Sequence, residues 1–230
     1  MTHDDLLAAL CFVATLAVYL LARRLHLRFR KFWCAPIIVT PLCMLGLLLL
    51  ADIPYSIYFA DTRWLMWLLG PTTVAFALPI YQQRQLIRRY PLSLTVGVVT
   101  GVLLGVGSSW ILARLFVLPP MVAHSLLTRS ISTPFALTAA NEFGGSRELV
   151  VLFVMLTGIV GMLVGEVLLG WLRVHSSIAR GASLGAAAHA VGTAKARELG
   201  QEEGAVSSLT MMFAGIVMVL LAPWLAHWLV

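Results

Sequence analysis

Six long stretches of this chain carry no charged residue, and each approaches the length that a membrane-spanning helix requires. They are Leu6–Ala22, Phe32–Ala51, Trp64–Gln83, Tyr90–Ala113, Leu149–Gly165 and Gly204–Val230. A helix needs roughly 20 apolar residues to cross the hydrocarbon core of a bilayer. Because no water is present there to bond the backbone, a spanning segment must satisfy its own N–H and C=O groups, which predicts that each stretch is helical.

The composition supports a membrane rather than an aqueous setting. Of the 230 residues, 60% are hydrophobic and only 11% are charged, whereas soluble domains carry about 25% charged residues. This excludes a soluble globular fold, and also intrinsic disorder, which requires low hydrophobicity. The net charge of +6 comes from basic residues beside the apolar stretches, a pattern that orients membrane proteins. We therefore predict an all-α polytopic protein in a lipid bilayer, with no nucleic-acid partner.

Two further stretches are too broken or too short for a simple span. Leu115–Asn141 is interrupted by three prolines and Arg129, and Gly181–Ala194 consists mostly of Gly, Ala, Ser, His and Thr. Interrupted segments of this kind are the sequence indication of a transporter's binding site, because unwound backbone offers free N–H and C=O groups to a substrate. The alternative is a small-residue helix packed tightly among its neighbours.

Basic residues in the loops predict the orientation of the chain. The loops Arg23–Lys31 and Gln82–Arg89 are rich in arginine, so the positive-inside rule places both in the cytoplasm and the N-terminus outside. The loop Arg173–Arg180 leaves two schemes open. In the cytoplasm it gives six full spans plus two broken or re-entrant elements, and outside it gives eight spans. We favour the first scheme, and both place the C-terminus outside a multi-pass protein of the cell inner membrane.

The favoured scheme divides the chain into two regions and predicts an inverted repeat. Residues 1–118 form an N-terminal four-helix membrane region, and residues 119–230 hold both broken elements and two spans. Each broken element precedes a long apolar helix, and the two enter from opposite sides of the bilayer. A short internal similarity supports this pairing, because Ala140–Gly144 (ANEFG) and Ala196–Gly200 (ARELG) occupy the same place in the two halves.

Arg129 is the first candidate for chemistry. It lies in an apolar setting and is followed by the hydroxyl residues Ser130, Ser132 and Thr133. A cation at mid-membrane costs about 2.5–3.5 kcal/mol on insertion scales, so it usually faces a cavity or a partner. Together with Ser130 and Thr133 it could bind a small carboxylate by charge-assisted hydrogen bonds. The alternative is an interfacial arginine that reaches the lipid headgroups.

His189 is the second candidate, because it is the only bulky polar residue in a run of glycine and alanine that ends at Gly192 and Thr193. It could donate a hydrogen bond to a substrate anion or carry a coupling proton. The alternative is a structural histidine bonded to a carbonyl.

Further polar residues interrupt or precede the later apolar helices. Glu203, Ser207 and Ser208 stand at the start of the last span; Glu203 is a candidate for proton coupling, although acids also suit a helix N-terminus. Glu166 interrupts the preceding apolar helix and therefore requires a cationic partner, on a neighbouring element or on another subunit. Glycines repeat every four residues from Gly97 to Gly105, which predicts close helix crossing.

Signatures of soluble enzyme chemistry are missing. The sequence has no nucleophile elbow, zinc-protease helix, phosphate-binding loop or dinucleotide-binding glycine pattern. No histidine has the spaced companions of a metal site. We therefore expect no enzymatic activity, no metal and no cofactor.

The C-terminal half resembles the LrgB/CidB family of membrane proteins. Four blocks carry the resemblance, and they are Arg129–Ala136, Ala179–Gly185, His189–Ala194 and Glu203–Leu209. The family usually has Lys where Arg129 stands, which keeps the charge but changes its geometry. It usually has Thr and Ser where Ala186 and Ala188 stand, so two hydroxyls beside His189 are absent here.

This resemblance implies two functions. One is transport of small monocarboxylates of the pyruvate, glycolate or glycerate type, with an LrgA/CidA-like membrane subunit as partner in a homo- or hetero-oligomer. The other is an antiholin-like role in murein hydrolase export and autolysis. The broken elements favour transport by alternating access, coupled to a proton on His189 or Glu203. We predict a substrate site in which six residues surround one carboxylate. They are Arg129, Ser130, Thr133, His189, Gly192 and Thr193.

Overall fold

A computed structural model describes residues 3–29, 32–75 and 77–229, and these residues form helices joined by short loops, without a strand among them. Arg30 and Lys31 of the predicted basic loop, and Val230 of the last apolar stretch, lie outside the described residues. The chain separates into two compact units, Met1–Pro71 and Thr72–Val230. The predicted region boundary at residue 118 marks where the broken elements begin, and it stays a prediction.

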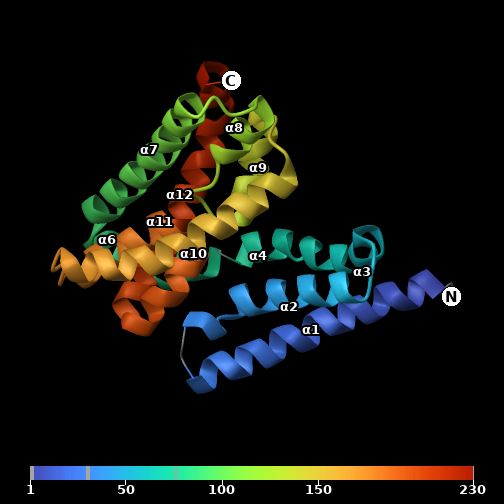
Figure 1. The fold of residues 1–230 in the computed structure, drawn as a ribbon. Coiled ribbons are helices and arrows are strands. Elements are labelled where there is room, and N and C mark those ends of the chain that lie inside the picture. Colours follow the sequence, from blue (N-terminus) through green and yellow to red (C-terminus); the bar gives the residue numbers. More distant parts are fainter. Residues whose placement is uncertain (1–2, 30–31, 76, 230) are drawn as a thin grey trace. The chain divides into compact units, whose positions relative to one another are not determined.

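The first unit consists of apolar helices that pack side by side. Its elements are α1 (His3–Phe29), the 3₁₀ turn η1 (Phe32–Cys34), α2 (Pro36–Leu50), α3 (Tyr55–Trp67) and the start of α4 (Leu69–Ala75). The long helix α1 contacts both α2 and α3 (Figure 1). Much of the apolar surface of this unit is exposed, for example Leu21 of α1 and Leu49 of α2. In a protein without a surrounding lipid phase this would be an aggregation-prone surface, whereas in a bilayer it faces lipid.

The second unit contains three long helices and two broken elements. Its elements are α5 (Ala77–Gln82), α6 (Arg84–Arg89), α7 (Pro91–Leu115), α8 (Pro120–Leu126), α9 (Thr133–Phe143), α10 (Arg147–Trp171), α11 (Ser177–Leu199) and α12 (Gln201–Leu229). Pro91 and Pro120 each stand in the first turn of a helix, where the missing N–H costs nothing.

All six predicted spans correspond to apolar helical segments. Five are long and apolar enough to cross a membrane, and they are Asp4–Phe29, Tyr55–Gln82, Pro91–Leu115, Arg147–Trp171 and Gln201–Leu229. The sixth, Pro36–Leu50, is a shorter apolar helix of 15 residues. The prediction of an all-α polytopic membrane protein is confirmed.

The first broken element is a hairpin, named hairpin 1 here (residues 120–143). The helix α8 ends at Leu126, the chain is non-helical through Ser132, and α9 returns from Thr133. The chain that follows α9 returns to the last turn of α8, because the N–H of Ser146 donates to Ser125 Oγ at 2.9 Å. Pro134 stands in the first turn of α9, where its fixed φ suits a helix start and its missing N–H costs nothing.

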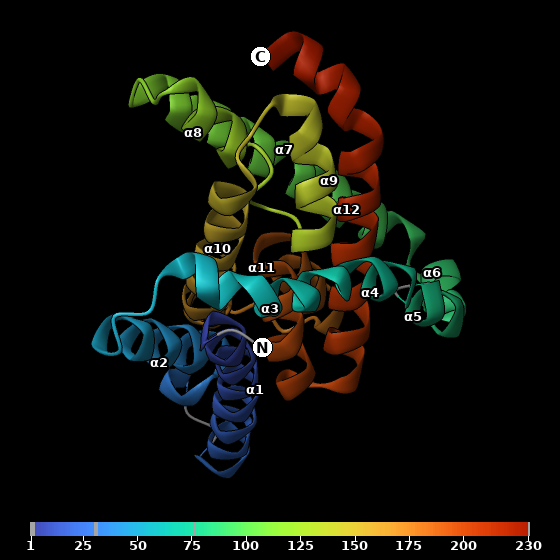
Figure 2. The ribbon, with the colours of Figure 1, turned by 90° about the vertical axis from the view of Figure 1, so that its right-hand side faces the viewer.

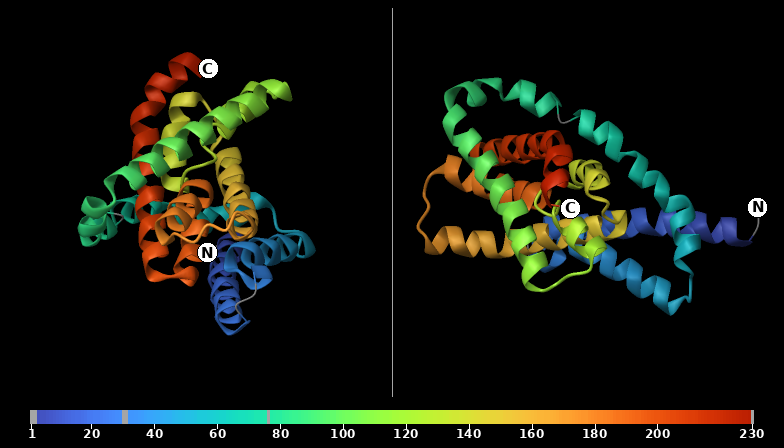
Figure 3. Two further views of the ribbon diagram at one scale, coloured as in Figure 1. Left: turned by 90° about the vertical axis from the view of Figure 1, so that its left-hand side faces the viewer. Right: turned by 90° about the horizontal axis from the view of Figure 1, so that it is seen from above.

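The second broken element also doubles back, and it is named hairpin 2 (residues 177–199). Within α11, His189 has a non-helical backbone with φ 39° and ψ −121°. Leu184 before the break and Ala196 after it pack in one apolar cluster with Leu169 of α10. In a continuous helix Leu184 and Ala196 would stand roughly 18 Å apart. Hairpin 2 therefore enters and leaves on one side, which Figure 3 shows beside the loop that joins α10 to α11.

The two hairpins open toward opposite ends of α7. Near the start of α7, a methyl group on Gly97 would lie 3.2 Å from Cβ of Ala182 in the first arm of hairpin 2. Further along, Gly105 faces Ser130 at the tip of hairpin 1, and α7 continues from there toward α8. This is the arrangement of the six-span scheme. The eight-span alternative would need α11 to cross in one piece, whereas its backbone breaks at His189; the number of spans stays a prediction.

The predicted glycine spacing marks a close helix crossing. On α7, a methyl group at Gly101 would lie 2.7 Å from Cβ of Ala186, and one at Gly105 would lie 2.6 Å from Cβ of Ser130. On α10, Gly161 faces Ala188 in the same manner, at 2.8 Å. Small residues allow the backbones to approach where no hydrophobic force drives association.

The internal similarity falls on equivalent positions of the two hairpins. Gly144 ends α9 and its N–H bonds to Ala140 O, while Gly200 ends α11 and its N–H bonds to Ala196 O. Each glycine is followed by a long helix, α10 or α12, and Figure 2 shows α12 running beside α9. The match between ANEFG and ARELG is therefore a match between two helix ends with one role.

Candidate functional site

The tips of the two hairpins touch in the interior of the second unit. Nε2 of His189 lies 3.2 Å from the backbone oxygen of Arg129. A carbonyl oxygen only accepts, so the imidazole donates its Nε2 proton in this contact. His189 is 2% exposed, and a methyl group on Gly158 of α10 would lie 3.1 Å from its Cε1. His189 thus makes the structural hydrogen bond to a carbonyl that the sequence left open as an alternative.

The side chain of Arg129 turns away from His189 and toward α7. Its Nε donates to Ser109 Oγ at 2.9 Å, and its Nη2 donates to Ser108 Oγ at 2.8 Å. Two consecutive serines of one helix therefore hold one edge of the guanidinium. The side chain does not extend to a lipid headgroup as an interfacial arginine would.

Arg129 has no acidic counterion in the part of the chain that the structure describes. Its two side-chain partners are neutral hydroxyls, and the ion pairs in the second unit involve Lys195 instead. A partly buried charge usually has a charged partner, because the Coulomb attraction offsets the cost of removing it from water. Among the residues that the structure describes, the charge of Arg129 is therefore uncompensated.

A cavity of about 750 Å³ lies beside this guanidinium. Its wall is made by α7, by the first arm of hairpin 2 and by the tip of hairpin 1. The lining residues are Leu92, Ser93, Val96, Gly97, Thr100, Gly101, Leu104, Gly105, Ser108, Arg129, Ser130, Ser176, Ile178, Ala179, Ala182, Ser183, Ala186 and Ala187. Arg129 is the only charged residue among them. Along α7 the cavity runs from Leu92 to Ser108, roughly 24 Å at about 1.5 Å per residue.

Two of the six predicted substrate residues line this cavity, and four lie elsewhere. Arg129 and Ser130 form its wall at the tip of hairpin 1. Thr133 begins α9, and His189 lies at the crossing of the two tips. The substrate role of Arg129, Ser130, Thr133 and His189 stays a prediction.

The remaining two predicted substrate residues pack inside hairpin 2 and against α12. Gly192 touches the backbone oxygen of Leu184, leaving no room for a side chain. Thr193 Oγ1 lies 2.9 Å from Ser207 Oγ on α12. Both residues are buried, and they join the second arm of hairpin 2 to its neighbours. Their role in binding a substrate stays a prediction.

The three coupling candidates lie in the first turns of α12. Glu203 stands beside Gly200 at the open end of hairpin 2. Ser207 pairs with Thr193, and Ser208 donates to the backbone oxygen of Gly204 at 2.9 Å. None of the three lines the cavity. Their role in proton coupling stays a prediction.

Sequence reasoning missed the two serines that hold Arg129. Ser108 and Ser109 lie near the end of an apolar helix, where serine is unremarkable. One signal was available, because Ser109 continues the four-residue spacing of Gly97, Gly101 and Gly105. Ser109 therefore lies on the helix face that packs against the broken elements.

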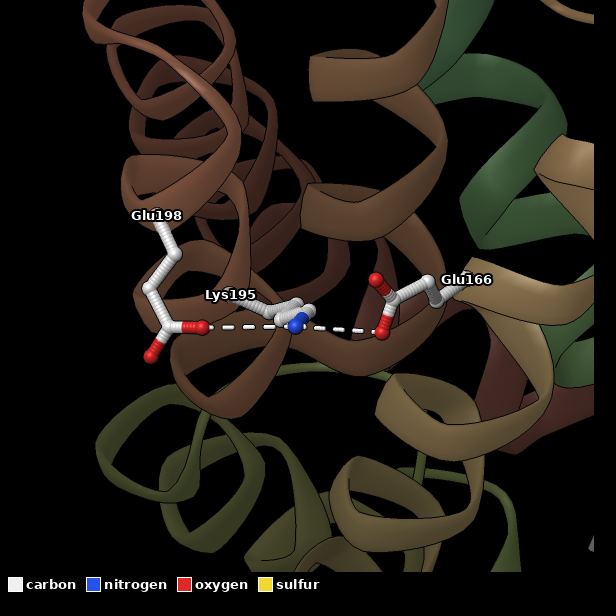
Figure 4. Close-up of polar contacts among 3 residues, drawn as sticks. All are labelled: Glu166, Lys195 and Glu198. Carbon is white, nitrogen blue, oxygen red and sulfur yellow. Dashed lines mark hydrogen bonds and ion pairs between the residues drawn. The ribbon is translucent and has the colours of Figure 1, made fainter. Parts of the chain in front are cut away.

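The sequence predicts a cationic partner for Glu166, and in the structure this partner is Lys195 in the second arm of hairpin 2. Lys195 Nζ lies 3.0 Å from Glu166 Oε2 and 3.3 Å from Glu198 Oε2, as Figure 4 shows. The expectation that Glu166 pairs with a cation of a neighbouring element is confirmed. This ion pair ties hairpin 2 to α10 at the end of a contact that is otherwise built from glycine, alanine and apolar residues.

Comparison with known proteins shows similarity over nearly the whole chain. The model of the LrgB-like family matches residues 15–228. The uncharacterized protein YwbG of Bacillus subtilis is 35% identical over 211 residues, which is 92% of this chain and 94% of that protein. The holin-like protein CidB of Staphylococcus aureus is 33% identical over 221 residues, 96% of each chain. No solved structure matches.

Proposed function

The chain belongs to the LrgB-like family of membrane proteins, and from this premise we propose that it carries small monocarboxylates across the cell inner membrane. The observation that carries the proposal is Arg129, an uncompensated cation in the wall of a cavity that has no acid in its lining. The substrates proposed are of the pyruvate, glycolate or glycerate type. The chain acts as a carrier and not as an enzyme.

The charge of the cavity favours a monoanion. A bound carboxylate supplies the counterion that Arg129 lacks, and a guanidinium binds a carboxylate through two parallel N–H···O bonds. The surrounding wall contributes hydroxyls and small residues, among them Ser130, Ser183 and Ala186. A dianion would leave one negative charge without a partner in this setting, which is costly away from water.

The orientation of the cavity supports alternating access. Its far end, at Leu92 and Ser176, adjoins the arginine-rich helix α6 and the loop Arg173–Arg180. By the positive-inside rule this end faces the cytoplasm, and both chain termini are outside. The opposed hairpins form the inverted pair that such carriers use. We propose that their movement exposes Arg129 to the other side, with a proton as the coupling ion.

The first prediction concerns Arg129. We expect Arg129→Ala to abolish saturable uptake of labelled pyruvate and glycolate into proteoliposomes, because the cavity then has no cation. Arg129→Lys, which keeps the charge but loses the planar fork, should retain uptake with a raised KM.

The control for this prediction is Arg147→Ala, which removes an arginine that does not line the cavity and should leave KM unchanged. Saturable carboxylate uptake that persists unchanged in Arg129→Ala would contradict the proposed function.

The names of relatives favour a second candidate function. CidB proteins of two Staphylococcus species are named holin-like. As this second candidate, we propose an antiholin-like role in murein hydrolase export and autolysis, exerted in a hetero-oligomer with an LrgA/CidA-like subunit. Deleting the gene should then change the rate of autolysis while carboxylate uptake stays the same, which is the opposite of what the transport proposal expects.

A further inference from the structure

We propose that Ser108 and Ser109 of α7 are positioning residues of the anion site, and that they hold Arg129 so that a carboxylate binds end-on through its two terminal nitrogens. The inference rests on the proposed function, because it concerns the same cavity. It adds two residues that neither the sequence motifs nor the similarity to relatives singled out. Three observations support it. The serine hydroxyl protons are already bonded to backbone oxygens, the serines bind one particular edge of the guanidinium, and the two serines differ in burial.

Both serines can only accept hydrogen bonds from Arg129, because the proton of each hydroxyl is already used. Ser109 Oγ donates its own proton to the backbone oxygen of Gly105 at 2.7 Å, and Ser108 Oγ donates to the backbone oxygen of Leu104. A hydroxyl has one proton, so each oxygen then presents only lone pairs to the guanidinium. The helix backbone thereby fixes the direction of both oxygens, and neither can rotate to become a donor without losing its bond to α7.

The serines occupy one particular edge of the guanidinium. They accept from Nε and from Nη2, which is one of the two edges that can bind a carboxylate with two parallel bonds. Of the five N–H donors of an arginine, the two on Nη1 and the second on Nη2 make no hydrogen bond to the residues that the structure describes. The edge that remains is the end formed by Nη1 and Nη2, and Arg129 lines the cavity.

The two serines differ in burial, and this difference indicates different roles. Ser109 is completely buried, with 0% of its surface exposed, so its oxygen serves only to fix Nε. Ser108 is partly exposed and lines the cavity, so its oxygen stands next to the space that the carboxylate would fill. Next to them, Gly105 receives Ser130 at the tip of hairpin 1. The tip of hairpin 1 therefore packs on α7, and the two serines fix the orientation of the Arg129 guanidinium.

The test compares serine variants of the full-length protein in two assays, uptake of labelled pyruvate into proteoliposomes and thermal unfolding in detergent with and without pyruvate. We expect Ser109→Ala to raise KM about 10-fold, as expected for one lost hydrogen bond to a charged group, with Vmax nearly unchanged. Ser108→Thr keeps the hydroxyl, so its KM should rise far less than that of Ser109→Ala.

The sharpest comparison is Ser108→Asp against Ser108→Asn, which differ in charge but hardly in size. The aspartate places a carboxylate on Arg129 and acts as an internal anion. We expect Ser108→Asp to lose saturable uptake and stabilisation by pyruvate, yet to unfold at the same or a higher temperature than Ser108→Asn. Ser108→Asn should retain uptake with a raised KM. A merely structural role would not combine a preserved fold with lost anion binding.

Thr138→Ala is the matched control, because Thr138 is an exposed hydroxyl that donates to a backbone oxygen of its own helix, that of Pro134, at 3.0 Å. Its KM should be that of the original chain. Ser109→Ala with an unchanged KM, or equal behaviour of Ser108→Asp and Ser108→Asn, overturns the inference while transport stands. If the original chain neither takes up pyruvate nor is stabilised by it, the proposed function falls and the inference falls with it.

Discussion

At the scale of single residues, His189 shows how one side chain stabilises an unfavourable turn. Its backbone, φ 39° and ψ −121°, is close to the first central position of a type II′ turn, which glycine normally occupies. The imidazole compensates by bonding to the backbone oxygen of Arg129. One residue therefore reverses hairpin 2 and also fastens its tip to hairpin 1.

This predicts that, at position 189, glycine is more stabilising than alanine, which is the reverse of their usual order in a helix. Both His189→Ala and His189→Gly lose the bond to Arg129, which costs about 1–3 kcal/mol. Glycine accepts the positive φ without strain, so His189→Gly should unfold at a higher temperature than His189→Ala. At the neighbouring helical position, Ala190→Gly should instead lower the unfolding temperature by the usual helix penalty of about 1 kcal/mol. A His189→Ala variant more stable than His189→Gly would contradict this account.

At the scale of elements, the contact between α10 and hairpin 2 is smooth except for one ion pair. Gly158, Gly161 and Gly165 allow α10 to lie against both arms of the hairpin. Lys195 and Glu166 form the charged contact across it (Figure 4). The side chain of Glu166 is about half exposed. Because an exposed pair is weak, it does not hold the elements together by itself, and we expect it to add a small preference for the register that the glycine contacts already set.

A double-mutant cycle measures this contact. We expect Glu166→Ala and Lys195→Ala to lower the free energy of unfolding, with a coupling between them of about 0.5 kcal/mol that decreases in high salt. Glu198→Ala is the control, because Glu198 bonds Lys195 within one arm and should couple hairpin 2 to α10 far less. A coupling of zero between Glu166 and Lys195 would show that the pair adds no preference for this register.

At the scale of the whole molecule, the second unit is organised around two hairpins that open to opposite sides and touch at their tips. The cavity reaches Arg129 from the side on which α7, α11 and α12 begin. Because the arginines of α6 and of the loop Arg173–Arg180 lie on that side too, the positive-inside rule predicts that it is the cytoplasmic side. This gives a membrane orientation that can be measured without knowing the substrate.

Cysteine labelling tests this orientation. In a variant with Cys11, Cys34 and Cys43 replaced, we expect Ser176→Cys, which is exposed at the cavity end, to react with a membrane-impermeant maleimide only in inverted vesicles. Met121→Cys, exposed near the open end of hairpin 1, should react only in right-side-out spheroplasts. Reaction of both positions from the same side would overturn the opposed hairpins, because their open ends must lie on different faces.

Much of this fold could be predicted from local sequence patterns. Spanning helices follow from hydropathy, and the breaks near Pro134 and at His189 follow from residues that interrupt or border a helix. The site was predicted less fully. The meeting of the two broken stretches was expected, but the residues on the cavity wall were not, because Ser108 and Ser109 have no motif that distinguishes them from ordinary helix serines. Some predicted substrate residues, such as Thr193, instead pack against α12.

The amino-acid sequence by itself determined that the chain lies in a membrane, where its helices run and where two of them break. These properties depend on neighbours within a few residues, since each spanning helix bonds its own backbone. Only the tertiary structure decided which atoms meet across those breaks. Arg129 and His189 are 60 residues apart, and no local pattern encodes that the backbone of the first meets the imidazole of the second while the guanidinium turns to α7. That choice follows from the close packing of glycine faces, which only the folded chain brings together.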